Sequence, residues 1–196
     1  DPWSDAPELV AITPLGKVPA FVTDDGMLVT ESTLIAEYFD AIGSGAGLLG
    51  ADRLSTLRQT ALAQGLIDAA FALVVERRRP AARQWEAWSA RQEQAIERTL
   101  RKVTAPGVFD LADITLACGL AYLDFRLPEL AWHSLRPDLA RWLDDVAQRP
   151  SMQALREAQR GRRGEGGRRS ARKRNATPDG LRDNSSRHRN RSKTPA

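Results

Sequence analysis

Apolar and turn residues at the start of the chain follow a pattern that predicts a β-hairpin and then a helix. Two short apolar runs flank Asp25-Gly26, where glycine accepts a positive φ without steric cost. From about Glu31 to Ile42, apolar residues recur at helical spacing. Residues 43–47, rich in glycine, end this helix and form a linker. We also expect a short helical turn within residues 1–13.

The rest of the apolar pattern is helical. A long helix is predicted from Arg53 to Pro80, and another from about Arg83 to Val103. Trp85 and Trp88 are expected on the buried side of the second helix. Pro137 is well placed to start a later helix, because proline fits the first helical position. Its inner face, and the apolar residues of a short last helix after Pro150, are predicted to be Leu139, Trp142, Leu143, Val146, Met152 and Leu155.

The segment after Phe109 carries the start signal of a central helix. Asp110 can cap the free amides, and Asp113 can accept from the Asp110 amide in a capping box. Because two carboxylates three residues apart repel, we expect a weakened box and a structural role for Asp113. The predicted buried stripe consists of Ile114, Ala117, Cys118, Ala121, Tyr122 and Phe125. Burial raises the pKa of a thiol, so Cys118 is expected to be inert.

Charge divides the chain into two parts. The net charge of +4 combines −6 over residues 1–157 (16 basic, 22 acidic) with +10 over residues 158–196 (13 basic, 3 acidic). Residues 160–196 contain no aromatic residue, Ile or Val, so this tail cannot bury enough apolar surface to order itself. Its basic clusters could contact nucleic-acid phosphates weakly and without sequence preference. The alternative is a non-native extension.

Several classes of protein are disfavoured by the composition. Cys118 is the single cysteine, and the two histidines lie far apart in sequence, so we expect neither a disulfide framework nor a metal site. No apolar run approaches the ~20 residues needed to span a bilayer, and no signal peptide is visible. We therefore expect a cytoplasmic protein that does not bind a membrane.

Three short motifs within the first 32 residues carry a family resemblance. The run Pro14-Leu15-Gly16-Lys17-Val18-Pro19-Ala20, followed by Asp25-Gly26 and Glu31-Ser32, resembles the glutathione-binding half of bacterial-type cytosolic glutathione transferases. The resemblance implies a cis Val18–Pro19 bond, with the backbone of Val18 bound to the cysteinyl part of glutathione. It implies that Glu31 and Ser32 hold the γ-glutamyl carboxylate, and that Lys17 lies near the glycyl end. Taken singly, Ser32 could be an ordinary helix cap and Pro19 a trans edge-strand proline.

The resemblance also implies the fold class, α/β plus all-α. Residues 1–43 would form a partial thioredoxin-like domain, residues 47–157 the helical carboxy-terminal domain of a transferase, and residues 158–196 a disordered basic tail. At the position of Asp110, the family usually has Ser or Thr. Asp68 has two interpretations: the family's cleft-facing polar residue, which sometimes reaches the partner subunit's glutathione amine, or a solvated carboxylate.

Because residue 1 is Asp, we expect the chain to be a fragment, a processed product or an incomplete gene product. The family's first strand, first helix and second strand would precede it, together with the catalytic Ser, Tyr or Cys. The catalytic residue therefore stays unassigned.

Two functions remain open. The first is a glutathione transferase that uses glutathione as co-substrate for an electrophile and is impaired by the missing segment. The resemblance implies that it is a homodimer. The second is a non-catalytic interaction module whose basic tail tethers it to nucleic acid.

Overall fold

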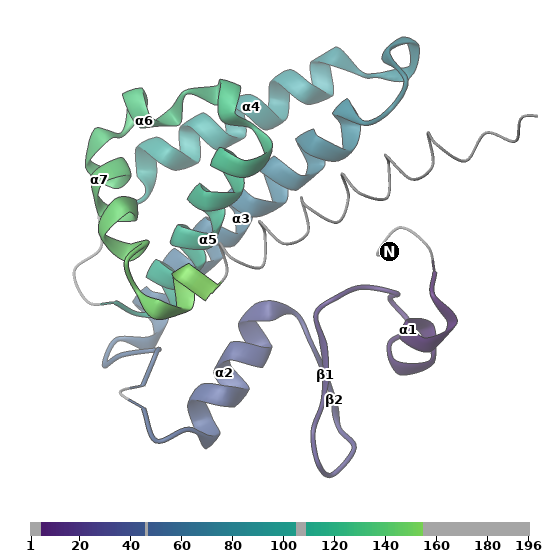
Figure 1. The fold of residues 1–196 in the computed structure, drawn as a ribbon, viewed down its shortest axis with the longest axis vertical. Helices are drawn as coiled ribbons and strands as arrows, with labels where there is room; N and C mark the ends of the chain where they lie inside the picture. The colour runs from purple at the N-terminus through teal and green to yellow at the C-terminus, as the bar shows by residue number, and fades with distance from the viewer. Residues whose placement is uncertain (1–4, 46, 105–108, 155–196) are drawn as a thin grey trace, which may run out of the picture. The chain divides into compact units, whose positions relative to one another are not determined.

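The computed structural model describes residues 5–45, 47–104 and 109–154 (Figure 1). The chain divides into two compact units, residues 1–148 and 149–196, and each is described by itself. The tail 158–196, predicted to be disordered, lies outside the described residues. The elements of the first unit are α1 (Pro7–Ile12), β1 (Ala20–Val22), β2 (Leu28–Thr30), α2 (Ser32–Ile42), α3 (Arg53–Arg77), η1 (Ala81–Arg83), α4 (Glu86–Lys102), α5 (Leu111–Arg126), η2 (Pro128–Leu130), α6 (Trp132–Leu135) and α7 (Pro137–Val146).

The predicted hairpin is confirmed. Strands β1 and β2 pair antiparallel with Phe21 opposite Val29. Gly26 adopts φ +88°, and its N–H donates to the carbonyl of Thr23 at 2.9 Å. The N–H of Thr23 donates to the carbonyl of Met27 at 3.0 Å. This is a three-residue hairpin loop with a glycine in the left-handed region, where a side chain would be strained.

Helix α2 packs on one face of the hairpin through aromatic rings. The ring of Phe21 lies 5.5 Å from that of Tyr38 and 4.9 Å from that of Phe39. Val29 is buried on the same face of the two strands, because Phe21 and Val29 are directly opposite each other. The carboxylate of Asp40 accepts the N–H of Leu48 at 2.7 Å, which ties the helix to the linker that follows it.

The helical core forms where α3 packs against both α4 and α5 (Figure 1). Gly119 of α5 allows close approach to α3, because an added Cβ would lie only 3.2 Å from Cγ1 of Ile67. The fully buried apolar side chains come from all three helices and the segments after α5, and include Leu66, Leu73, Ile96, Leu100, Leu120, Leu123, Leu127, Trp132 and Leu139. No helix among the described residues is long and apolar enough to cross a membrane.

The capping box at the start of α5 is present. The N–H of Asp113 donates to Oδ1 of Asp110 at 3.1 Å, and the N–H of Asp110 donates to Oδ2 of Asp113 at 3.4 Å. Asp110 also accepts the hydroxyl of Thr56 on α3 at 3.1 Å, so the cap joins two helices. Burial, and then the nearby charge of Asp110, raise the pKa of Asp113 to about 6. The expected repulsion between the two carboxylates is therefore visible in the pKa of Asp113.

Arg136 joins the end of α4 to the start of α7. Its guanidinium donates to the carbonyls of Leu100 and Val103 at the end of α4. It also forms two hydrogen bonds with Asp138, at 2.8 and 2.7 Å, and these bonds lower the pKa of that carboxyl. One side chain thus satisfies backbone acceptors that a helix end leaves free.

Two predictions about burial are wrong. Trp85 is 62% exposed, because α4 begins only at Glu86 and Trp85 lies in the preceding turn, where its ring stacks on Trp88. The buried side of α5 is also not the predicted stripe, of which only Ala117 is buried. Helix α5 is apolar around most of its circumference, so spacing alone could not select the face that α3 covers. The buried residues are Leu111, Ala112, Asp113, Leu116, Ala117, Gly119, Leu120 and Leu123.

The described part of the second unit is short. Residues 151–154 are helical, as predicted after Pro150, and Leu155 lies outside the described residues.

Candidate functional site

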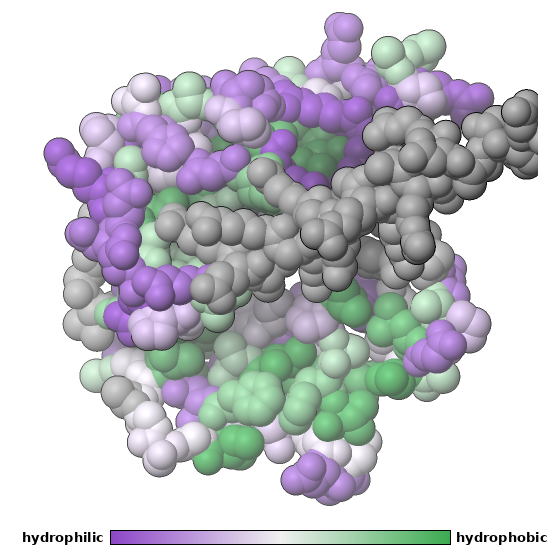
Figure 2. All heavy atoms as spheres, viewed as in Figure 1, coloured by the Kyte–Doolittle hydropathy of each residue, from purple (hydrophilic) through white to green (hydrophobic). Residues whose placement is uncertain are grey.

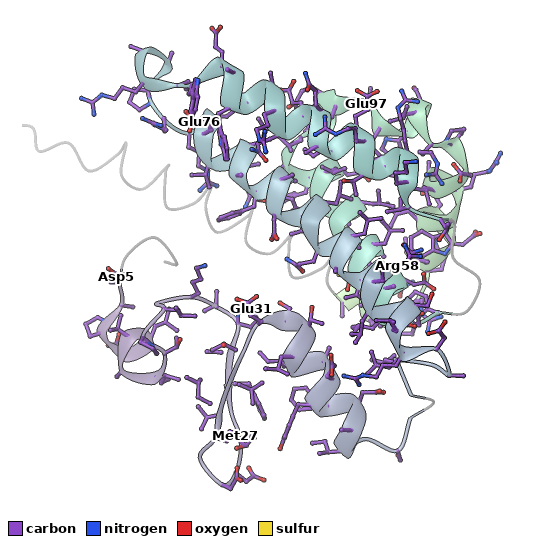
Figure 3. The ribbon with its side chains drawn as sticks, turned by 180° about the vertical axis from the view of Figure 1, so that it is seen from behind. Asp5, Met27, Glu31, Arg58, Glu76 and Glu97 are labelled. Atoms are coloured by element: carbon purple, nitrogen blue, oxygen red, sulfur yellow. The ribbon has the colours of Figure 1, made fainter. Side chains whose placement is uncertain are left out.

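The residues that the sequence singles out lie in two neighbouring segments of the first unit. Lys17, Val18 and Pro19 form the end of the loop before β1, and the Val18–Pro19 bond is cis, as the resemblance implied. Glu31 and Ser32 lie where β2 passes into α2, with Glu31 at the cap position and Ser32 as the first helical residue. Figure 3 shows Glu31 at this start of α2.

The start of α2 has an unusual backbone. Glu31 adopts φ +70° and ψ +130°, which a residue with a side chain rarely does. Such conformations cost about 1–3 kcal/mol and cluster at ligand sites. No side chain caps this helix among the described residues, and both Glu31 and Ser32 are exposed. The first amides of α2, at the positive end of its dipole, can therefore receive an anion.

These segments line one pocket with helix α3, which we call the α2 pocket. Its volume is about 400 Å³. All five residues predicted from the sequence line it, and α3 contributes three more side chains. The lining residues are Leu15, Gly16, Lys17, Val18, Pro19, Thr30, Glu31, Ser32, Gln64, Asp68 and Phe71.

The charged groups of the α2 pocket are of both signs. Lys17 supplies the cation, and Glu31 and Asp68 supply carboxylates. Nε2 of Gln64 donates to Oδ1 of Asp68 at 2.9 Å, which orients that carboxylate. A pocket with this combination is suited to a zwitterionic ligand that also carries a further carboxylate.

Asp68 lines the α2 pocket and is exposed there, so its position is compatible with both interpretations, a cleft-facing residue and a solvated carboxylate. Sequence reasoning missed Gln64 and Phe71. Their spacing with Asp68, at i, i+4 and i+7, places all three on one side of α3, and that periodicity could have indicated a common face. The signal was hidden because Phe71 looks like a core residue in sequence, whereas it is 48% exposed.

Neither Cys118 nor Tyr122 lines the α2 pocket. Burial raises the pKa of the Cys118 thiol and of the Tyr122 hydroxyl. Both groups are therefore protonated at neutral pH. The described residues also contain no cluster of His, Cys, Asp and Glu that could hold a metal ion.

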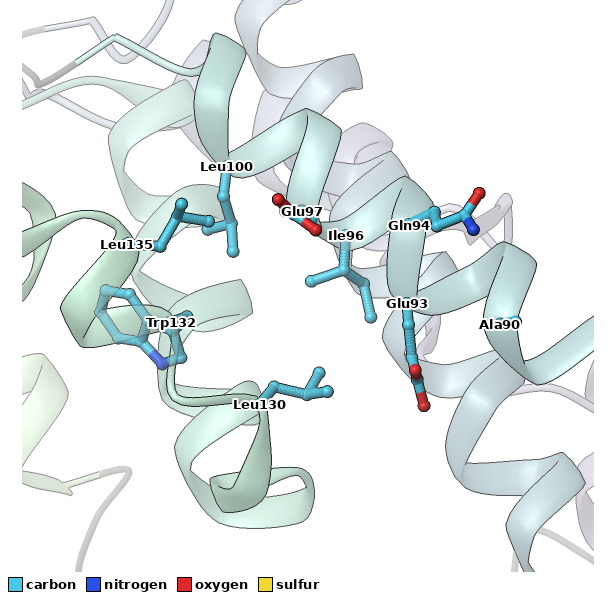
Figure 4. A pocket seen from close by; sticks show the side chains of 9 residues that line it. All are labelled: Ala90, Glu93, Gln94, Ile96, Glu97, Leu100, Leu130, Trp132 and Leu135. Carbon is cyan, nitrogen blue, oxygen red and sulfur yellow. The ribbon is translucent and has the colours of Figure 1, made fainter.

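A second pocket lies on the helical part, between α4 and the segment from η2 to α6 (Figure 4). Its volume is about 370 Å³, and it combines apolar side chains with Glu93, Gln94 and Glu97. Both carboxylates already have arginine partners: Arg77 at 2.8 Å from Glu93, and Arg101 at 2.7 Å from Glu97. It contains none of the residues singled out from the sequence.

Comparison with known proteins decides the family. A family model described as the glutathione S-transferase, N-terminal domain, matches residues 1–42. The uncharacterized GST-like protein YibF of Escherichia coli K12 is 34% identical over 161 residues, which span 76% of this chain and 80% of that protein. The chain belongs to the glutathione S-transferase family.

Solved structures agree with this assignment. A glutathione transferase family member from Pseudomonas fluorescens Pf-5, crystallised with bound glutathione, is 37% identical with a TM-score of 0.72, over 76% of this chain and 78% of that one. A second structure of such a family member from the same organism, with bound S-(propanoic acid)-glutathione, is 38% identical with a TM-score of 0.69, over 73% and 78% of the two chains. The predicted fold class, a partial thioredoxin-like domain followed by a helical transferase domain, is therefore confirmed for the described residues.

The tail that the alternative function requires lies outside the described residues. Nothing in the structure or in the related proteins supports a nucleic-acid tether.

Proposed function

We propose that this glutathione S-transferase family member binds glutathione in the α2 pocket. One observation carries the proposal: the five residues that the family resemblance implies as glutathione ligands all line a single pocket of about 400 Å³. Two related solved structures, at 37 and 35% identity, contain bound glutathione. Small-ligand pockets typically measure about 300–1,000 Å³, so the volume is suitable for a tripeptide.

Each end of glutathione has a suitable group in the pocket. Its γ-glutamyl end is a zwitterion, so the N–H and hydroxyl of Ser32 would receive the carboxylate at the start of α2. The carboxylates of Glu31 and Asp68 would attract the ammonium group. Lys17 would pair with the glycyl carboxylate. The backbone of Val18, beside Pro19, would hydrogen-bond the cysteinyl part.

The reaction that we propose is transfer of the glutathione sulfur to an electrophile. The cysteinyl thiolate attacks an electrophilic carbon, a C–S bond forms, and the displaced electron pair leaves with a leaving group or takes up a proton. The S-(propanoic acid)-glutathione in one related structure is a thioether of this kind. Phe71, on the helical side of the pocket, would contact the electrophile. We assign no residue to thiolate stabilisation, and we retain the homodimer as part of the proposal.

Calorimetric titration of glutathione into the full chain, beside Ser32→Ala, tests the binding site. Loss of a charge-assisted hydrogen bond costs about 1.5–3 kcal/mol, so affinity should fall about 10- to 150-fold. Ser134→Ala is the matched control, because Ser134 is an exposed helical serine of α6 that does not line the pocket. Its affinity should equal that of the unchanged chain.

Two results would count against the proposal in different ways. Equal affinity of Ser32→Ala and the unchanged chain would mean that glutathione does not place its carboxylate at the start of α2. Absence of binding to a chain with its full helical circular dichroism signal would mean that the α2 pocket is not a glutathione site in this protein.

A further inference from the structure

The α3 side of the α2 pocket continues beyond the pocket itself. Gln64, Asp68 and Phe71 line the pocket from one face of α3. Arg78 follows Phe71 by seven residues, about two helical turns, so it lies on the same face, and it is exposed. With a rise of about 1.5 Å per residue, its backbone lies about 10 Å beyond that of Phe71 along the helix axis. A ligand that extends past Phe71 along this face therefore approaches an arginine.

The position of Arg78 differs from that of the arginines on either side of it. Arg77 pairs with Glu93 of α4, and Arg79 pairs with the buried Glu76. These two pairs hold the end of α3 in place. Of the three arginines, Arg78 is the one that continues the face lining the α2 pocket. Figure 2 shows hydrophilic residues over most of the upper, helical part of the molecule.

One side of α5 is partly open. Most of the residues that the sequence predicts as its buried stripe are only half-buried: Ile114, Cys118, Ala121, Tyr122 and Phe125. Tyr122 and Arg126 are four residues apart on this helix, so their side chains are neighbours. The guanidinium carbon of Arg126 lies 4.3 Å from the centroid of the Phe125 ring. This side of α5 is therefore an apolar surface that ends in a cation.

The two arginines come together at Tyr122. Burial raises the pKa of the Tyr122 hydroxyl, and the charges of Arg126 and Arg78 act in the opposite direction. Both guanidinium groups are therefore near this hydroxyl, although they come from two helices that pack against each other. Because the hydroxyl keeps its proton at neutral pH, it can donate a hydrogen bond. Two arginines and a hydroxyl donor are suitable partners for an anionic oxygen group.

We propose that the electrophilic substrate carries a carboxylate or a similar anionic oxygen group, and that Arg78, Arg126 and the hydroxyl of Tyr122 bind this group. The inference rests on the proposed function, because it requires glutathione in the α2 pocket. The reacting carbon would lie at the glutathione sulfur, the apolar body of the substrate would contact Phe71, and the anionic group would lie at the far end. The two arginines would thus select the substrate by its charge.

Calorimetric titration of two glutathione thioethers into the full chain tests this selection. S-(p-carboxybenzyl)glutathione and S-(p-carbamoylbenzyl)glutathione have nearly the same shape and differ in the charge of one group. We expect the carboxylate to bind about tenfold more tightly, which is the effect of one charge-assisted hydrogen bond. Arg78→Gln and Arg126→Gln should each bring the two affinities closer together. Arg141→Gln, on the exposed side of α7, is the matched control and should leave their ratio unchanged.

The possible results separate this inference from the proposed function. If glutathione binds but the carboxylate shows no advantage over the amide in the unchanged chain, the inference is overturned and the glutathione site stands. A carboxylate preference that survives undiminished in both Arg78→Gln and Arg126→Gln would also overturn it, because the anion would then be held elsewhere. If glutathione itself does not bind, the proposed function fails, and the inference fails with it. Each comparison is a ratio of two ligands on one chain, so a less stable variant still gives an answer.

Discussion

The charge of Asp113 should make the helical part less stable as pH rises. Its pKa of about 6 lies well above the ordinary value of 3.8, first because of burial and second because of Asp110. Between these two pH values the folded chain holds a proton that the unfolded chain has released. The free energy of unfolding therefore falls as pH rises from about 4 to about 6, and this group adds no further change above that range.

The size of this effect follows from the shift. A difference of about 2 pKa units corresponds to roughly 3 kcal/mol, and Asp113 is only 8% exposed, so little is lost to screening. Asp110 is the second cause of the raised pKa of Asp113, so we assign less than half of this free energy to Asp110. Asp110→Asn removes its charge and keeps Oδ1 as acceptor for the amide of Asp113. Its NH2 group takes the place of Oδ2, so the bond to Thr56 is kept with its direction reversed, the hydroxyl oxygen of Thr56 accepting. We compare the free energy of unfolding of this variant with that of the unchanged chain at each pH. The difference should favour the variant by about 0.5–1.5 kcal/mol more at pH 8 than at pH 4.5.

Urea unfolding of both chains at several pH values measures this difference. Asp52→Asn is the control, because Asp52 is also a helix cap, accepting the Ser55 amide at 3.0 Å at the start of α3. It should shift stability by a similar amount at pH 8 and pH 4.5. A pH-independent effect of Asp110→Asn, or a gain that is larger at pH 4.5, would refute the electrostatic explanation of the Asp113 pKa.

Two further outcomes follow from the packing. Arg136→Lys should lower the free energy of unfolding, measured with urea, by about 1–3 kcal/mol. The reason is that one lysine cannot bond to Asp138 and to two carbonyls at the end of α4 at the same time. Arg141→Lys, on the exposed side of α7, is the control and should change this free energy little. We expect residues 20–42 to be less stable than α5. If glutathione binds as proposed, it should therefore slow hydrogen exchange in residues 20–42 by a larger factor than in α5. Uniform slowing would contradict this expectation.

The sequence predicted the hairpin and α2 because their signals are local. Asp25-Gly26 requires only a backbone conformation that glycine accepts, and Glu31-Ser32 directly precedes the apolar spacing of α2. The cis bond at Pro19 was a different kind of prediction. It came from the family resemblance of the surrounding motif, since proline alone favours trans.

Burial within the helical part was harder to predict, because it depends on which neighbours a helix meets. Helix α5 is apolar on most sides, and the close approach at Gly119 decides which side α3 covers. Trp85 was misplaced for a related reason: α4 begins one residue later, so helical spacing does not apply to its side chain. Phe71 shows the same limit at the site, where an apolar residue of α3 lines a pocket.

The α2 pocket joins a firmly packed part of the chain to a weakly packed one. In the described part, Val29 is the only buried apolar residue before Ala63. The contacts between α2 and the residues that follow it include the hydrogen bond from the amide of Leu48 to Asp40 and the ion pair of Glu37 with Arg53 at 2.9 Å.

An ion pair with an exposed arginine contributes less than about 1 kcal/mol, so the Glu37–Arg53 pair adds little to the stability of this contact. A ligand that touches both Ser32 and Asp68 would bridge the two parts and add its binding free energy to their association. We therefore expect the affinity measured for the pocket to include a cost of ordering residues 15–42. For this reason, substitutions that stabilise the hairpin without touching the pocket should raise ligand affinity, an effect that contacts within the pocket cannot explain.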